Sequence, residues 1–174
     1  MSIEFQEQLN FDFNKKRFYL NDEAIVLHCH HYTTLLTQLA NDAAKFNGPK
    51  IMFLAAEETF YPILKKYFED NNINSEEDKI SIVEQYYSYI GFGLMKIDFA
   101  NKSVELIHSH IDEAWLKKWT TFEKPVNYIT QGFISAAFSA ITGNNPGIFN
   151  VEEIQSIVCG AETSKFIIEL NQGE

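Results

Sequence analysis

The five histidines of the chain lie in two short clusters, and imidazole is the side chain best suited to metal ligation and proton transfer near neutral pH. The first cluster surrounds one of the chain's two cysteines, and the second is followed at once by carboxylates. The clustered residues are His28, His30 and His31 in the first, with His108 and His110 in the second, closely followed by Glu113. We therefore ask whether the clusters meet in one site.

If they meet, the chemistry is that of a non-haem metal centre holding iron or zinc. Two histidines and one carboxylate bind Fe(II) while leaving open positions for substrate. The available carboxylates are Glu57, Glu58, Asp112 and Glu113. The alternative is that these histidines cap the ends of strands and helices or pack around a pocket. No longer motif, such as HExxH, decides between the two interpretations.

The second cluster continues a strand-like alternation. Val104, Leu106, His108 and His110 share one face if residues 103–110 are extended. Because Val104 and Leu106 are apolar, we expect this face to point into the core. Imidazoles there need a hydrogen bond, a ligand or a metal.

Composition limits the class of protein. The 174 residues are 45% hydrophobic, with 15 Phe and 8 Tyr, which indicates one folded, aromatic-rich domain over residues 1–174. With 24 acidic and 14 basic residues, the net charge of -10 disfavours nucleic acid as a partner. No apolar stretch reaches the roughly 20 residues that span a bilayer. The start has no basic segment followed by an apolar run, so we expect a cytoplasmic protein.

Hydrophobic spacing predicts strands at both ends of the chain and helices in the middle. We expect strands over 11–21, 24–29, 94–99, 103–110, 149–158 and 164–170. We expect helices over 32–46, 57–69, 75–89, 112–119 and 125–141, the third opened by Ser75 and Asp78 as a capping box. This order predicts an α+β domain, with helices on one side of a mainly antiparallel sheet.

The order of motifs in the second half resembles the 4-vinyl reductase domain. The resemblance covers roughly residues 75–170 and rests on spacing and small residues, at 91–93, 125–127, 132–136, 153–156 and 160–166. It implies the fold shared with TRAPP vesicle-tethering subunits and haem-based nitric oxide sensors. It also implies a hydrophobic pocket for a hydrocarbon, aromatic, lipid or tetrapyrrole ligand, and a homodimer.

Zinc-binding members of that family carry a Glu, a Cys three residues on, a Cys eight further, and an earlier Cys after Pro-Val. This chain has the Glu, at Glu153, but Ser156, Ser164 and Asn127 occupy the cysteine positions. Hydroxyl and carboxamide groups are poor zinc ligands beside thiolates. Cys159 lies three residues past the expected position. We expect the family's zinc site to be absent.

Four aromatic residues at helical spacing are candidates for the wall of a ligand pocket, and core packing is the alternative. They are Trp115, Trp119, Phe133 and Phe138. Three hypotheses follow. The first is a 4-vinyl-reductase-type domain that binds a small apolar or aromatic molecule. The second is a metal-dependent enzyme built on the histidines, and the third is an interaction subunit without a small ligand. No catalytic residue can be assigned from the sequence.

Overall fold

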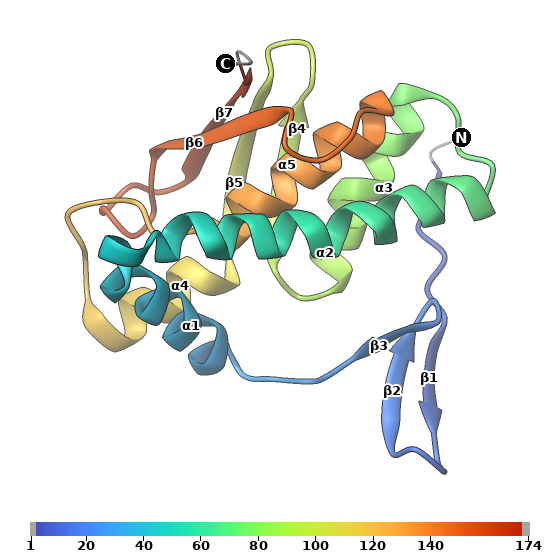
Figure 1. The fold of residues 1–174 in the computed structure, drawn as a ribbon, viewed down its shortest axis with the longest axis horizontal. Coiled ribbons are helices and arrows are strands. Elements are labelled where there is room, and N and C mark those ends of the chain that lie inside the picture. Colours follow the sequence, from blue (N-terminus) through green and yellow to red (C-terminus); the bar gives the residue numbers. More distant parts are fainter. Residues whose placement is uncertain (1–2, 172–174) are drawn as a thin grey trace.

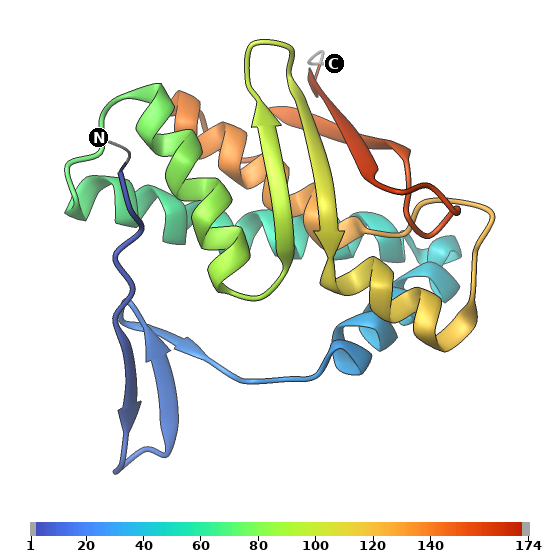
Figure 2. The ribbon, with the colours of Figure 1, turned by 180° about the vertical axis from the view of Figure 1, so that it is seen from behind.

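A computed structural model describes residues 3–171 and confirms the α+β prediction. A four-stranded antiparallel sheet has the strand order β4-β5-β7-β6. The strands are β4 (Gly93–Asp98), β5 (Ser103–Ser109), β6 (Phe149–Gln155) and β7 (Ser164–Leu170). Helices pack against one face of this sheet, with the strands in front of them when the molecule is seen from behind (Figures 1 and 2).

The helices follow the predicted order, with different bounds. They are α1 (His30–Asp42), the short 3-10 helix η1 (Ala44–Phe46), α2 (Gly48–Asp70), α3 (Glu76–Tyr89), α4 (His110–Trp119) and α5 (Tyr128–Thr142). The Ser75 hydroxyl accepts the Asp78 N–H at 3.1 Å, which confirms the predicted cap of α3. α2 starts nine residues before the predicted 57, because Pro49 occupies its first turn, where proline needs no N–H partner. No helix among residues 3–171 has the length and apolar character to cross a bilayer.

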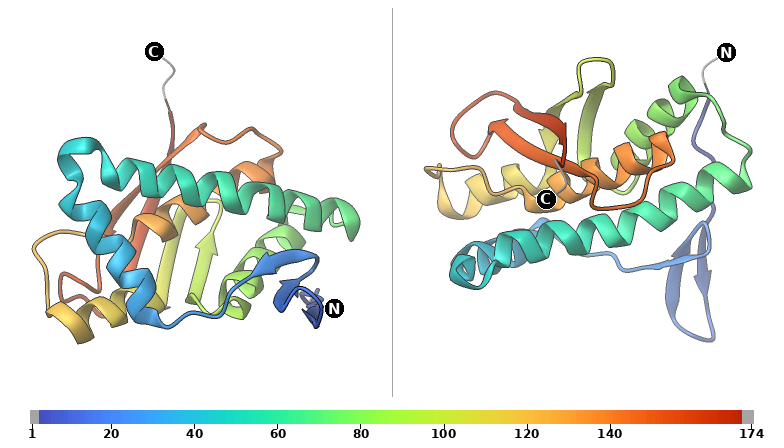
Figure 3. Two further views of the ribbon diagram at one scale, coloured as in Figure 1. Left: turned by 60° about the horizontal axis from the view of Figure 1, so that its bottom comes forward. Right: turned by 45° about the horizontal axis from the view of Figure 1, so that its top comes forward.

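The N-terminal residues form an arm that extends away from the main body (Figure 3). We use "arm" for residues 3–27. It contains a separate antiparallel sheet of β1 (Leu9–Asp12), β2 (Arg17–Leu20) and β3 (Glu23–Ile25). The strand predicted over 11–21 is therefore a hairpin, and the strand predicted over 24–29 ends at Ile25. Asn21 and Asp22 turn β2 into β3 with positive φ angles of 49° and 69°, which asparagine and aspartate tolerate better than most residues.

A β-bulge reverses the predicted facing of His108 in the second histidine cluster. Leu94 pairs with His108 and Met95 with Leu106, so one residue of β5 is left over between them. Val104, Leu106 and Ser109 are buried as a result, while the His108 side chain is 69% exposed. The expectation that His108 faces the core is wrong. The physical reason is that one extra residue shifts the two-residue alternation to the other face.

The core is organised by close contact between α2 and α5. A Cβ at Gly132 would lie 2.2 Å from the carbonyl oxygen of Phe53 and 2.7 Å from the Ala56 side chain. Glu57, only 1% exposed, accepts a hydrogen bond from the Ser135 hydroxyl at 2.6 Å and from the Gly147 N–H at 2.9 Å. These contacts hold α2 across α5. They explain the small residues that the sequence places in α5.

We predict that Gly132→Ala destabilises the fold. Helix propensity favours alanine by about 1 kcal/mol, but overpacking against the backbone of α2 costs about 1–3 kcal/mol or more. Urea unfolding should therefore show a lower free energy of unfolding. Ser88→Ala, at an exposed site of α3, is the control and should change stability by less than about 0.5 kcal/mol. Equal or greater stability of Gly132→Ala would contradict the close α2–α5 contact.

Candidate functional site

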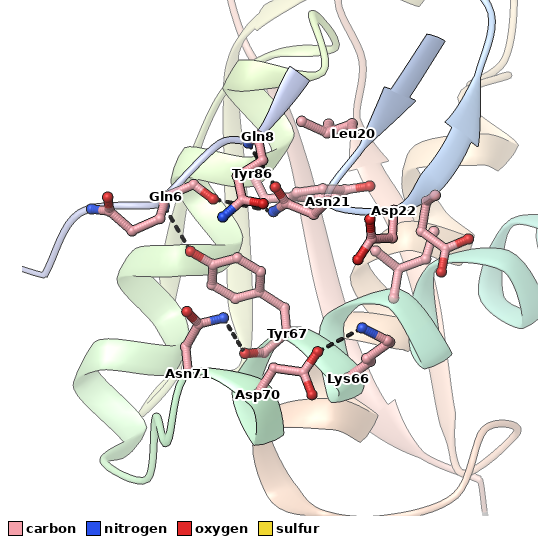
Figure 4. Close-up of a pocket in the computed structure, with 12 residues that line it drawn as sticks. Gln6, Gln8, Leu20, Asn21, Asp22, Lys66, Tyr67, Asp70, Asn71 and Tyr86 are labelled. Carbon is pink, nitrogen blue, oxygen red and sulfur yellow. Dashed lines mark hydrogen bonds and ion pairs between the residues drawn. The ribbon is translucent and has the colours of Figure 1, made fainter. Parts of the chain in front are cut away.

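A cavity of about 220 Å³ lies where the arm meets α2 and α3. We call it the arm pocket (Figure 4). Its lining residues come from three distant parts of the chain. The arm gives Gln6, Gln8, Leu20, Asn21, Asp22 and Glu23, α2 and its end give Ile63, Lys66, Tyr67, Asp70 and Asn71, and α3 gives Tyr86.

The arm is tied to the helices beside this pocket by hydrogen bonds. The Gln6 N–H donates to the Tyr67 hydroxyl at 2.7 Å, and the Phe5 N–H donates to Gln85 Oε1 at 2.8 Å. The Asn21 side chain closes the arm on itself, accepting the Gln8 N–H at 2.8 Å and donating to the Gln6 carbonyl at 3.2 Å. The wall that the arm contributes is therefore defined by specific bonds.

Two tyrosine rings supply the aromatic surface of the pocket. Phe5, buried between them, lies 4.8 Å from the Tyr67 ring and 5.5 Å from the Tyr86 ring, measured between centroids. Leu20 and Ile63 add aliphatic surface. Burial raises the pKa of Tyr86 to about 12, and the charge of Glu23 adds to this effect. Tyr86 is therefore a neutral hydroxyl at physiological pH.

The structure brings parts of the two histidine clusters near each other. The His110 ring centroid lies 5.7 Å from that of His30 and 6.4 Å from that of His28. Burial lowers the pKa of His110, and the neighbouring His30 and His28 lower it further. The His31 ring centroid lies 4.5 Å from that of His30, with the two rings tilted by 31°, and His31 is exposed.

The remaining predicted ligands point elsewhere. His108 Nδ1 lies 3.8 Å from Glu113 Oε1 on the surface, where both side chains are exposed. Asp112 is fully buried and turned away into a polar network, and Glu57 is engaged by Ser135. Within residues 3–171, no three His, Cys, Asp or Glu side chains are grouped closely enough to hold a metal ion.

The positions that carry zinc ligands in the resembled family do come together, as a buried network of oxygen and amide groups. Asp112 Oδ2 accepts from Asn127 Nδ2 at 3.1 Å and from the Ser164 hydroxyl at 3.3 Å. The Asn127 N–H donates to Glu153 Oε2 at 3.4 Å. Ser156 lies against Glu153 and accepts the Val158 N–H at 3.2 Å.

This network does not fit a thiolate zinc site. Its donors are hydroxyls, a carboxamide and carboxylates, whereas structural zinc takes sulfur and imidazole ligands. Cys159 is exposed and lies beside Ser156 at the edge of the network. Asp112 Oδ1 and Glu153 Oε1 are buried without a hydrogen-bond partner among the described residues. Burial is the main cause that raises the pKa of the Asp112 and Glu153 carboxyls. The nearby charge of Asp112 raises the pKa of Glu153 further.

The four predicted pocket residues lie in two separate parts of the core. Trp115 and Trp119 pack at 4.9 Å in a small cluster with Phe122. Phe133 lies in the main core 4.9 Å from Tyr87, and Phe138 lies there 4.8 Å from Phe99. None of the four lines the arm pocket. That a ligand contacts them stays a prediction.

The arm pocket was not indicated by any local motif. Tyr67 and Tyr86 sit in helices without unusual spacing, Asp22 belongs to a turn, and Glu23 is the first residue of β3. The one available signal was Asn21-Asp22, a pair that favours a tight hairpin turn and could have marked the arm as a hairpin.

Because the Glu153 pKa is raised on folding, the folded state binds a proton more tightly than the unfolded state does. We predict that stability falls as pH rises above the ordinary carboxyl pKa of about 4, by up to about 1.4 kcal/mol per pH unit for each such group. Glu153→Gln should reduce this fall, measured as the free energy of unfolding between pH 5 and pH 8. Glu152→Gln, an exposed neighbour on β6, is the control. An unchanged slope in Glu153→Gln would show that this carboxyl is not the source.

No protein-family model matches the chain, and no curated protein matches it in sequence. Solved structures do match its fold. The phenol-responsive sensory domain of the transcription activator PoxR, solved with phenol, superposes with a TM-score of 0.74 at 12% identity. The match covers 95% of this chain and 87% of the PoxR domain.

A second match is a vinyl-4-reductase family protein from Methanocaldococcus jannaschii. Its TM-score is 0.50 at 15% identity, covering 68% of this chain and 67% of that protein. Similarity at this level of identity concerns the fold. It confirms that the chain has a fold of the 4-vinyl-reductase type.

Proposed function

We propose that the chain is a ligand-binding domain that holds a small aromatic molecule in the arm pocket. The observation that carries the proposal is the pocket itself, in which Tyr67 and Tyr86 provide aromatic surface and Leu20 and Ile63 provide aliphatic surface. Binding sites for small molecules typically combine such surface with a few polar groups. The backbone similarity to a phenol-responsive domain supports this class of function without identifying the ligand.

The position of the pocket suits a sensor. A ligand between the arm and the helices contacts both at once, so its binding energy favours the arrangement in which the arm is docked. Phe13, Val26 and Leu27 of the arm are exposed apolar residues, each more than 70% accessible. They offer a surface for the predicted homodimer, which we retain as part of the proposal.

The first test is thermal unfolding with phenol, 2-phenylethanol and 2-phenylethylamine. We predict that at least one raises the midpoint, because a ligand at 100 times its Kd stabilises the folded state by about 2.7 kcal/mol. Gln8→Trp, at the exposed rim of the pocket, should abolish the shift by filling the cavity. Asn150→Trp, at an exposed position of β6, is the matched control and should retain it.

The proposal fails if none of the three compounds shifts the midpoint of the wild-type protein. It also fails if Gln8→Trp, while folded, responds as strongly as the control. Either result would place ligand binding outside the arm pocket or remove it from this domain.

A metal-dependent enzyme is the second candidate, and the proximity of His28, His30 and His110 favours it. Iron or zinc there requires a movement that brings these imidazoles and a further ligand, such as Glu113 or His31, within bonding distance of one ion. We predict about one metal per chain after incubation with Zn²⁺ or Fe²⁺ and desalting, with a sharp loss in both His30→Ala and His110→Ala. Elemental analysis measures it. A clearly sub-stoichiometric metal content of the wild-type protein would rule this candidate out.

A further inference from the structure

The arm pocket carries an excess of negative charge. Three carboxylates and one ammonium group line it. Lys66 Nζ lies 2.6 Å from Asp70 Oδ2, so these two charges compensate each other. Asp22 and Glu23 have no lysine, arginine or histidine nitrogen within ion-pair distance among residues 3–171. Two carboxylates at the pocket are therefore left without an ion-pair partner among the described residues.

These two carboxylates are positioned by the turn between β2 and β3. Asn21, the first turn residue, is fixed through its side chain to the backbone of Gln6 and Gln8. Asp22 follows it directly and lies across the pocket from the end of α2 that carries Lys66 and Asp70 (Figure 4), and Glu23, the next residue, lines the same pocket. Their charges act on Lys66, whose pKa is raised first by its hydrogen bond to Asp70 and further by Asp22 and Glu23. The negative potential thus extends across the pocket.

A tyrosine hydroxyl without a partner among the described residues also lines the cavity. Tyr86 is 8% exposed, and its hydroxyl makes no hydrogen bond with any residue of the described chain, unlike that of Tyr67, which accepts the Gln6 N–H. The hydroxyl oxygen is not among the fully buried unpaired atoms of residues 3–171, so it is open to the pocket. The Tyr86 hydroxyl can accept a hydrogen bond from a ligand, and the charge of Glu23 acts on the same hydroxyl. A ligand with an N–H donor satisfies both groups.

The aromatic walls of the pocket also favour a ligand that contains an aromatic ring. Aromatic faces attract cations as well as other rings. With Tyr67 and Tyr86 as walls, an organic cation gains more binding free energy than a bare metal ion does. The reason is that its apolar part is also removed from water.

Resting on the proposed function, we propose that the ligand of the arm pocket is a protonated aromatic amine. Its ammonium group lies between Asp22 and Glu23 and donates to the Tyr86 hydroxyl, while its ring packs against Tyr67 and Ile63. Charge-assisted hydrogen bonds to carboxylates and contact with aromatic rings are the interactions that recognise such a cation.

The test compares 2-phenylethylamine with 2-phenylethanol, which differ at the terminal ammonium and hydroxyl groups. Isothermal titration should show tighter binding of the amine by about tenfold, the equivalent of 1.4 kcal/mol, since both carboxylates are partly exposed to solvent. The double variant Asp22→Asn, Glu23→Gln should lose this preference and bind the alcohol as before. Tyr86→Phe should weaken amine binding several-fold.

The control is the double variant Glu152→Gln, Glu162→Gln, which makes the same change in net charge away from the pocket. It should keep the preference for the amine. Loss of the preference in this control would mean that overall charge, not the pocket, selects the amine, and would overturn the inference. Equal binding of amine and alcohol by the wild type overturns the inference but leaves the proposed function standing. Binding of neither compound overturns both.

Discussion

The fold depends on the contact between α2 and α5 at Gly132. Because this residue has no side chain, the α2 backbone at Phe53 and Ala56 approaches α5 closely. The buried Glu57 carboxylate then joins α2 to Ser135 of α5 and to the loop before β6. A buried carboxylate is tolerated here because two donors satisfy the same oxygen.

This contact fixes the orientation of α2, a long helix that contacts different parts of the chain at its two ends. At one end, α2 begins beside α1 and η1. At the other end, it presents Ile63 and Tyr67 to the arm. The proposed ligand site therefore has one wall on a long helix and the other on the arm. In this account, the hydrogen bonds of Tyr67 and Gln85 to the arm backbone hold the second wall in place.

The sequence patterns predicted the number, order and type of most elements in the main body, since their hydrophobic spacing and caps are local properties. Ser75 with Asp78 is the clearest case. The bulge in β5 was not predictable, because it arises from pairing with β4 and moves His108 to the surface. The arm pocket was not predictable either, because residues 6–8, 20–23, 63–71 and 86 meet only in the folded chain. The sequence alone predicted that the zinc ligands of the resembled family are replaced. It did not predict that Asp112 lies at the centre of the resulting network.

The most direct measurement is a crystal structure of the full chain grown with 2-phenylethylamine. We predict electron density in the arm pocket, with the ring against Tyr67 and the nitrogen within hydrogen-bond distance of Asp22, Glu23 and the Tyr86 hydroxyl. Density for the amine at another site, with this pocket holding only water, would contradict amine binding in the arm pocket.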